Sequence, residues 1–187
     1  SKTFGRIKLV RSLNRLLRPE TIAVYGGSWS ENVVKELKKN SFLGEILAVH
    51  PTKKTIGGVN CYKTTFDLPL SPDAVFVGVN REKTVSIIEE LSVIDAGGVV
   101  CFASGFSETS VDDKSGQGKT LQDKIVKAAG QMPILGPNCY GFINYLDNAL
   151  IWPDQHGGEQ VDKGDAILTQ SSNIAINLTM QCRGLPI

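Results

Sequence analysis

An apolar run that ends in two glycines and opens into a helix constrains the fold of this chain more than any other segment. The run reads Thr21-Ile-Ala-Val-Tyr-Gly-Gly-Ser28. A strand that turns into a helix through glycines presents free backbone N–H groups to a phosphate. The alternative is a tight strand-to-helix turn that binds nothing. We expect phosphate contacts from five consecutive residues of this turn, namely Gly26, Gly27, Ser28, Trp29 and Ser30.

The second predicted strand, residues 46–49, is followed by lysines where a protein that binds NAD places an acid. The segment reads His50-Pro-Thr-Lys-Lys54. In the NAD version of such a fold, an Asp or Glu at this point holds the ribose hydroxyls. Ammonium groups suit a phosphorylated ribose instead, so we expect coenzyme A or NADP as the ligand. Pro51 directs Lys53 toward the phosphates and His50 lies in the same loop, whereas Lys54 is either a second ligand or a solvated neighbour.

Strand-like and helix-like segments alternate along most of the chain. Strands separated by helices of about ten residues indicate βαβ units with right-handed crossovers. We therefore predict an α/β fold with a Rossmann-like, doubly wound parallel sheet over residues 21–155, whose strand ends share one ligand-binding edge. The predicted helices cover residues 31–40, 81–94 and 119–129, and the further strands cover residues 73–79, 98–102 and 133–135.

Composition argues against nucleic-acid and membrane partners. Twenty basic and nineteen acidic residues give a net charge of +1, without a polybasic run. No apolar stretch approaches the roughly 18 residues that a membrane span needs. Four scattered cysteines, without a CxxC pair or clustered histidines, predict no metal site and a cytoplasmic setting, or the mitochondrial matrix in a eukaryote. Residues 1–20 favour an amphipathic N-terminal helix over a targeting peptide.

The C-terminal part of the chain reads as a linker followed by a new unit. Residues 156–164 lie in a polar, glycine-rich stretch, which is typical of a linker. Beyond it we expect a strand at 166–169 and a helix at 173–182. One strand and one helix cannot bury their own apolar faces, so residues 165–187 either pack on the first domain or begin a second, truncated domain. We favour the second interpretation.

Four further segments occur in the order of a known family. After the second strand stands His50-Pro-Thr-Lys53, and after the fourth stands Ala103-Ser-Gly-Phe-Ser-Glu108. The later segments are Leu135-Gly-Pro-Asn-Cys-Tyr-Gly-Phe-Ile-Asn144 and Gly164-Asp-Ala-Ile-Leu-Thr-Gln-Ser171. With the glycine turn, they resemble the CoA-binding half of the NDP-forming acyl-CoA synthetases, the superfamily of the succinyl-CoA synthetase alpha subunit. Residues 165–187 then resemble the start of the family's flavodoxin-like domain.

The resemblance implies further ligand contacts along the same edge. Small residues there let the backbone pass close to the nucleotide or pantetheine. Asn138 is also explained by a side-chain brace within its turn, and Ser172 or Asn173 by simple helix capping. The implied CoA contacts are Val79, Asn80, Ala103, Ser104, Gly105, Phe106, Pro137 and Asn138, and the implied phosphate contacts are Ser171, Ser172 and Asn173.

The resemblance also implies a reaction. Acid, CoA and a nucleoside triphosphate give acyl-CoA, nucleoside diphosphate and phosphate, through an acyl phosphate and a phosphohistidine. Neither His50 nor His156 stands at the phosphohistidine position. ATP or GTP and Mg²⁺ would bind through other domains or an ATP-grasp subunit, so we predict a CoA-binding portion that does not turn over alone. The alternatives are a non-catalytic CoA-binding module and the NADP-binding domain of a reductase.

Overall fold

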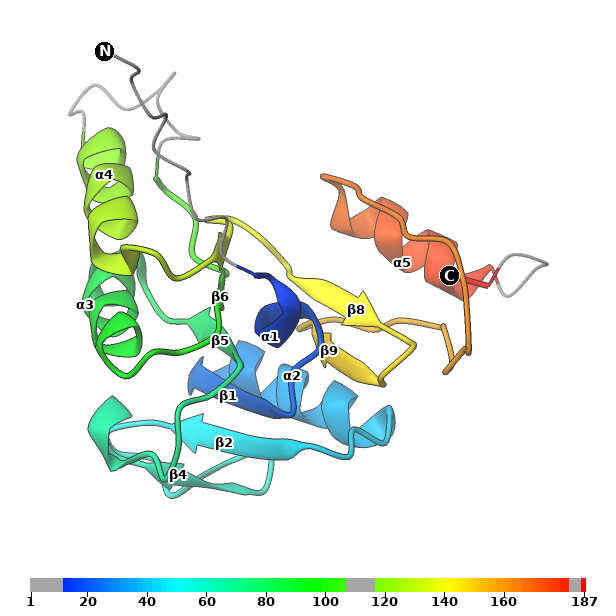
Figure 1. Cartoon of the computed structure of the whole chain (residues 1–187), viewed down its shortest axis with the longest axis horizontal. Helices are drawn as coiled ribbons and strands as arrows, with labels where there is room; N and C mark the ends of the chain where they lie inside the picture. Colours follow the sequence, from blue (N-terminus) through cyan, green and yellow to red (C-terminus); the bar gives the residue numbers. More distant parts are fainter. Residues whose placement is uncertain (1–11, 107–116, 182–185) are drawn as a thin grey trace, which may run out of the picture.

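The structure, a computed structural model, describes residues 12–106, 117–181 and 186–187, and is built on one mostly parallel sheet (Figure 1). Along the sheet the strand order is β3-β4-β2-β1-β5-β6-β7, and of the described strands of this sheet β3 alone runs antiparallel to its neighbour. The strands are β1 (Thr21–Gly26), β2 (Glu45–Val49), β3 (Thr55–Ile56), β4 (Val59–Tyr62), β5 (Ala74–Gly78), β6 (Val99–Cys101) and β7 (Ile134–Leu135).

Helices cover both faces of this sheet, as the sequence predicted. One core contains Ala23 and Tyr25 of β1 with apolar residues of α3 (Arg81–Val93) and α4 (Gln117–Ala129). The other contains Ile22 and Val24 with residues of α1 (Asn14–Leu17), α2 (Ser28–Lys39) and the hairpin of β8 (Phe142–Asn144) and β9 (Ala149–Ile151). Because alternate side chains of β1 enter opposite cores, all six of its residues are buried.

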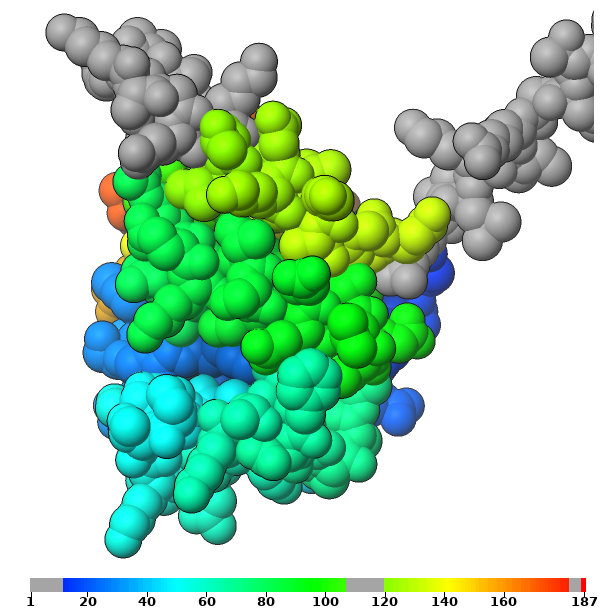
Figure 2. All heavy atoms as spheres, turned by 90° about the vertical axis from the view of Figure 1, so that its left-hand side faces the viewer, coloured from blue at the N-terminus to red at the C-terminus, as the bar shows by residue number. Residues whose placement is uncertain are grey.

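The strand order reverses beside β1, which fixes where a ligand binds. The chain moves outward from β1 to β2 and β4, then returns to β5 on the other side of β1 and continues to β6 and β7. Ligands of open α/β sheets bind at the carboxyl ends of the strands at such a reversal. The arrowheads of β1 and β2 point to the left in Figure 1, and Figure 2 views that side. There a blue band, the β1–α2 part of the chain, runs between the cyan loop after β2 and the green segments that include α3.

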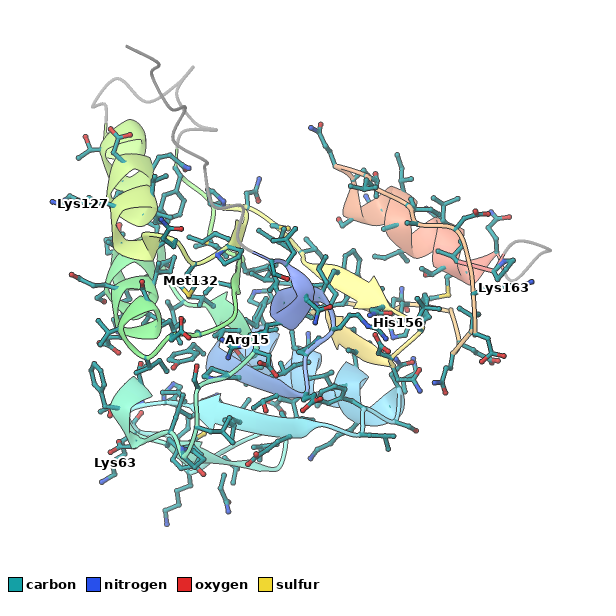
Figure 3. All side chains as sticks on the ribbon, in the orientation of Figure 1. Arg15, Lys63, Lys127, Met132, His156 and Lys163 are labelled. Carbon is teal, nitrogen blue, oxygen red and sulfur yellow. The ribbon has the colours of Figure 1, made fainter. Side chains whose placement is uncertain are left out.

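The predicted linker and the segment after it are only partly as expected. His156, within the linker, is buried, and its Nδ1 lies 2.8 Å from the hydroxyl of Tyr145, beside the β8–β9 hairpin (Figure 3). The strand predicted at 166–169 is wrong, because these exposed residues have no regular secondary structure. A strand needs a paired neighbour, and no described strand pairs with this segment. The predicted helix is α5 (Ser172–Met180), with Cys182 outside the described residues.

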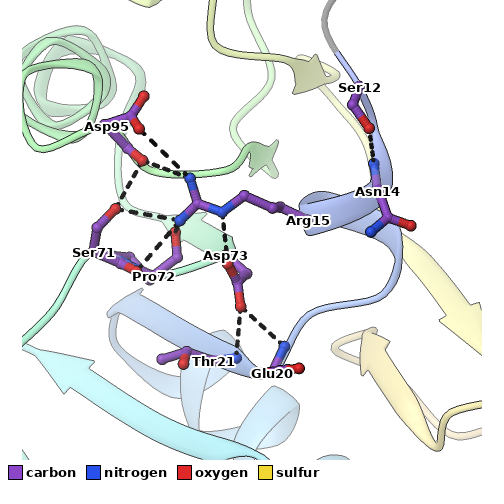
Figure 4. A network of polar contacts seen from close by, with 9 residues as sticks. All are labelled: Ser12, Asn14, Arg15, Glu20, Thr21, Ser71, Pro72, Asp73 and Asp95. Atoms are coloured by element: carbon purple, nitrogen blue, oxygen red, sulfur yellow. Dashed lines mark hydrogen bonds and ion pairs between the residues drawn. The ribbon is translucent and has the colours of Figure 1, made fainter.

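The opposite, amino-terminal edge of the sheet is held by Arg15 (Figure 4). Its Nε donates to Asp73 Oδ1 over 2.7 Å, and its Nη1 donates to the carbonyl oxygen of Asp95 over 2.8 Å. The other carboxylate oxygen of Asp73 accepts hydrogen bonds from the backbone N–H groups of Glu20 and Thr21. These contacts tie α1 to the start of β1 and β5. Of the helix predicted over residues 1–20, residues 1–11 lie outside the described part of the chain.

Candidate functional site at the carboxyl edge of the sheet

The glycine turn after β1 leads directly into α2, as predicted. Gly26 has a φ of +132°, and α2 begins at Ser28. The first N–H groups of a helix have no partner within it, so those of the first turn of α2 are available to an anion. Ser28 and Trp29 are exposed at this point. The turn therefore presents helix N–H groups at an exposed point of the sheet edge, and their contact with a phosphate stays a prediction.

Ser30 adds a buried hydroxyl beneath this turn. The side chain is fully buried, and its Oγ has no hydrogen-bond partner among the described residues. The Oγ lies 3.1 Å from where a Cβ on Gly26 would be, which places it against the turn. A buried hydroxyl without a partner costs free energy. A phosphate oxygen at the turn is the kind of acceptor that this hydroxyl lacks.

The loop after β2 is shaped by the ring of His50. Its Nδ1 accepts hydrogen bonds from the backbone N–H groups of Lys53, over 3.0 Å, and Thr52, over 3.2 Å. In a neutral ring with an accepting Nδ1, the proton lies on Nε2. Burial lowers the pKa of His50, and the positive charges of Lys53 and Lys83 lower it further. The neutral ring thus folds the loop back on itself and leaves an N–H donor at Nε2.

The lysines of this loop are exposed at the same edge. Neither Lys53 nor Lys54 forms an ion pair with a carboxylate in the part of the chain that the structure describes. Pro51 is exposed as well. The sequence did not single out Lys83, whose charge acts on His50 from the first turn of α3. The sequence feature that could have marked Lys83 is its position shortly after the end of β5, at the edge where ligands bind.

The turn after β5 serves mainly to cap α3. Asn80 is the N-cap of α3, and its Oδ1 accepts a hydrogen bond from the N–H of Lys83 over 3.0 Å. Arg81, which was not predicted as a site residue, donates from Nη1 to the carbonyl oxygen of Gly105 over 2.8 Å. Val79 packs partly against the core on the α3 side. The turn therefore joins α3 to the loop after β6.

The loops after β6 and β7 are tied together at the same edge. The N–H of Asn138 donates to the carbonyl oxygen of Ala103 over 2.9 Å, so this residue braces the loops through its backbone. Ser104 is exposed, and Pro137 is half-buried. Phe106 is fully buried in the core, so its side chain supports the loop from below. Residues 107–116, which include Glu108, lie outside the described part of the chain.

A row of aromatic rings starts at the glycine turn and was not predicted. Trp29 lies 5.0 Å from Phe102 between ring centroids, and Phe102 lies 5.6 Å from Tyr140. Tyr140 in turn lies 5.3 Å from Trp152, just after β9. The four rings are far apart in sequence and follow no periodic pattern. They connect the candidate site to the β8–β9 hairpin.

The serines before α5 act as a helix cap. Ser171 is the N-cap, and its Oγ accepts a hydrogen bond from the N–H of Ile174 over 3.3 Å. Ser172 and Asn173 are already helical, so the capping expected of them belongs to Ser171. No hydrogen bond of the described residues joins these three residues to the loops after β1 and β2. Their phosphate contact stays a prediction.

Metal ligands, membrane-spanning helices and pockets among the described residues bear on the class of site. No group of three or more His, Cys, Asp or Glu residues is placed to hold a metal ion there. None of the described helices has the length and apolar character needed to cross a membrane.

A polar pocket of about 190 Å³ lies along α2, between Asn32, Glu36 and Gln155, but none of the predicted ligand residues lines it. The predicted site is the open edge itself.

Comparisons with known proteins identify the family of this chain. A family model described as a CoA binding domain matches residues 20–145. The acetate–CoA ligase (ADP-forming) I of Archaeoglobus fulgidus is 31% identical over 71% of this chain and 19% of its own length. The alpha subunit of the acetate–CoA ligase (ADP-forming) II of Pyrococcus furiosus is 29% identical over 71% of this chain and 29% of its own length. The chain thus spans less than a third of these curated relatives.

A solved structure supports the fold. The structure of acetyl-coenzyme A synthetase 1 of Candidatus Korarchaeum cryptofilum, in complex with phosphate and ADP, aligns with a TM-score of 0.76. The alignment covers 90% of this chain and 36% of that chain, at 24% identity. At this level of identity the likeness establishes the Rossmann-like arrangement of strands and helices and nothing about residues of the site.

Proposed function

Since the chain belongs to the CoA-binding domain family, we propose that it binds coenzyme A at the carboxyl edge of its sheet. The observation that carries this proposal is the pair of exposed lysines after β2, Lys53 and Lys54, which have no carboxylate partner among the described residues. The phosphate on the ribose of CoA supplies the missing negative charge. The N–H groups at the start of α2 and the hydroxyl of Ser30 take the diphosphate.

We further propose that the chain is the CoA-binding part of an NDP-forming acyl-CoA synthetase. This assignment is supported by relatives named as ADP-forming acetate–CoA ligases and by the small share of their length that the chain spans. His156 is buried, and Nδ1 of His50 is engaged within its loop, so neither suits a phosphohistidine. That residue, the nucleotide and Mg²⁺ belong to other domains or to an ATP-grasp subunit. The free thiols of Cys61 and Cys139 support a reducing, cytoplasmic setting.

Calorimetric titration with CoA, dephospho-CoA and NADP⁺ tests the binding proposal. We expect saturable binding of CoA, weaker binding of dephospho-CoA and no saturable binding of NADP⁺. Lys53→Ala should weaken CoA binding about tenfold, because one charge-assisted contact is lost, and should leave dephospho-CoA nearly unchanged. Lys163→Ala is the matched control, since Figure 3 shows Lys163 on the side of the molecule opposite the ends of β1 and β2.

The outcomes separate the candidate functions. Equal affinity for CoA and dephospho-CoA would contradict the binding proposal, and saturable binding of NADP⁺ in place of CoA would favour a reductase domain. The reaction itself is tested by combining the chain with the remaining ligase domains or the ATP-grasp subunit, and measuring acyl-CoA formed from acid, ATP and CoA. A complex that binds CoA and forms no acyl-CoA is a non-catalytic module.

A further inference from the structure

Lys83 lies in the first turn of α3, at the same edge as Lys53. Tyr25 of β1 pairs with Val49 of β2 on one side and with Val77 of β5 on the other, so β2 and β5 end within one residue of the same level. Adjacent strands are about 4.8 Å apart, so these two ends lie roughly 10 Å from each other. α3 begins three residues after the end of β5. An extended lysine side chain from this turn therefore reaches the space beyond β1.

No described residue supplies a counter-ion for Lys83. The neighbouring carboxylate of Glu82 accepts a hydrogen bond from Nε of Arg81 over 3.0 Å. The side chain of Asn80 is engaged by the backbone N–H of Lys83 and not by its ammonium group. Lys83 is exposed and has no ion pair with any described residue. Glu82, the acid nearest to Lys83 in sequence, is thus already paired with Arg81.

Lys53 and Lys83 approach the same ring from different elements. Burial is the largest cause of the lowered pKa of His50, and the charges of Lys53 and Lys83 are the next two. Both ammonium groups are therefore close enough to His50 to repel a proton on it. Figure 2 shows the cyan loop after β2 and the green segments that include α3 on opposite sides of the blue band. Two cations that converge without a carboxylate repel each other until an anion binds between them.

We propose that Lys53 and Lys83 form the two sides of one subsite for the phosphate monoester on the ribose, with the Nε2–H of His50 as a neutral donor between them. The proposal rests on the proposed function, because it names a further residue of the same CoA site. A dianion held by two ammonium groups and one N–H donor is stabilised by charge-assisted hydrogen bonds on three sides. Lys83 then selects CoA over dephospho-CoA together with Lys53.

The test is a set of titrations of the chain and its Lys53→Ala, Lys83→Ala and double variants with CoA and dephospho-CoA. We expect Lys83→Ala to weaken CoA binding roughly five- to tenfold and to change dephospho-CoA binding less than twofold. The double variant should lose most of the preference for CoA over dephospho-CoA. Lys83→Arg, which keeps the charge, should retain most of the preference, and Lys163→Ala should change neither affinity. The thermal midpoint of each variant verifies that it folds.

An NMR titration of His50 checks the geometry without any ligand. Removing the ammonium group of Lys83 should raise the pKa of His50, because one of the charges that oppose its protonation is lost. An unchanged pKa in Lys83→Ala, or equal losses of CoA and dephospho-CoA affinity, would overturn the inference. In either case a wild-type preference for CoA that depends on Lys53 would leave the proposed function standing. Failure of the wild type to bind CoA would remove both.

Discussion

The backbone of Gly26 passes so close to Gly78 that a Cβ on Gly26 would lie 2.4 Å from the Gly78 carbonyl oxygen. These two residues are the last of β1 and β5, and they pair with each other in the sheet. The φ of +132° at Gly26 is also one that residues with a side chain rarely adopt. A glycine is therefore required where the strand order reverses, so that the chain turns from β1 into α2 directly over β5.

Replacing Gly26 tests this requirement. Gly26→Ala should lower the free energy of unfolding by roughly 1–3 kcal/mol, because the added methyl group meets backbone and the φ becomes strained. It should also weaken CoA binding through displacement of the turn. Urea denaturation and CoA titration measure the two effects.

The neighbouring glycine provides the control. A Cβ on Gly27 would have no atom within 4 Å, so Gly27→Ala should cost less stability than Gly26→Ala. Equal losses for both variants would show that the close approach to Gly78 is not the cause.

Asp73 should contribute more to stability than its ion-pair partner Arg15. Besides the 2.7 Å contact with Arg15, its carboxylate accepts backbone hydrogen bonds from Glu20 and Thr21. Asp73→Ala leaves those N–H groups without their acceptor and should cost about 2 kcal/mol in the free energy of unfolding. Arg15→Ala should cost about 1 kcal/mol or less, because the side chain of Arg15 is 41% exposed. Thermal and urea denaturation of both variants test this order, which a larger loss in Arg15→Ala would contradict.

His156 makes stability depend on pH. Burial lowers its pKa, which Glu36, with Oε2 3.4 Å from Nε2, opposes and Lys39 reinforces. Because the folded state favours the neutral ring, the unfolded chain takes up a proton first as the pH falls. The stabilising contribution is therefore complete above the unfolded pKa of about 6.5 and declines as the pH falls below it toward the folded pKa.

Replacement of His156 should flatten this dependence. We expect the free energy of unfolding of His156→Gln to vary less between about pH 7 and 5 than that of the wild type. His50 lies in a more open loop, so His50→Gln should retain most of the variation and serves as the control. A wild-type slope that persists in His156→Gln would assign the dependence to other groups. Urea denaturation at a series of pH values measures it.

Local sequence patterns predicted most of the fold and the family. The glycine turn, the strands and the helices α2, α3 and α4 lie close to their predicted positions, because period and turn residues act over short distances. The family resemblance, carried by loops at one edge, is confirmed by the matched CoA-binding model. The strand predicted at 166–169 is wrong, because a local pattern cannot show whether a partner strand is present.

What the sequence did not reveal depends on contacts between distant residues. Arg15 bonds to Asp73 across 58 positions, and no period or motif marks such a pair. The ring row that begins at Trp29 and Phe102 likewise joins separate elements. Lys83 was not predicted as a ligand residue because it lies on a helix, whereas the family motif places its lysine in the loop after β2. The assignment of individual ligand contacts stays a prediction for the titrations to test.

Asn80 separates helix capping from ligand binding. Its Oδ1 accepts a hydrogen bond from the N–H of Lys83, so Asn80→Ala should lower the free energy of unfolding by about 1 kcal/mol. Asn80→Asp keeps the cap and should leave stability unchanged. At an edge that binds phosphates, however, the added negative charge should weaken CoA binding severalfold, and more so at low salt. Asn80→Ser, a neutral cap, should preserve both properties. Denaturation and CoA titration of the three variants test this, and unaltered CoA affinity in Asn80→Asp would show that the turn after β5 lies away from the ligand phosphates.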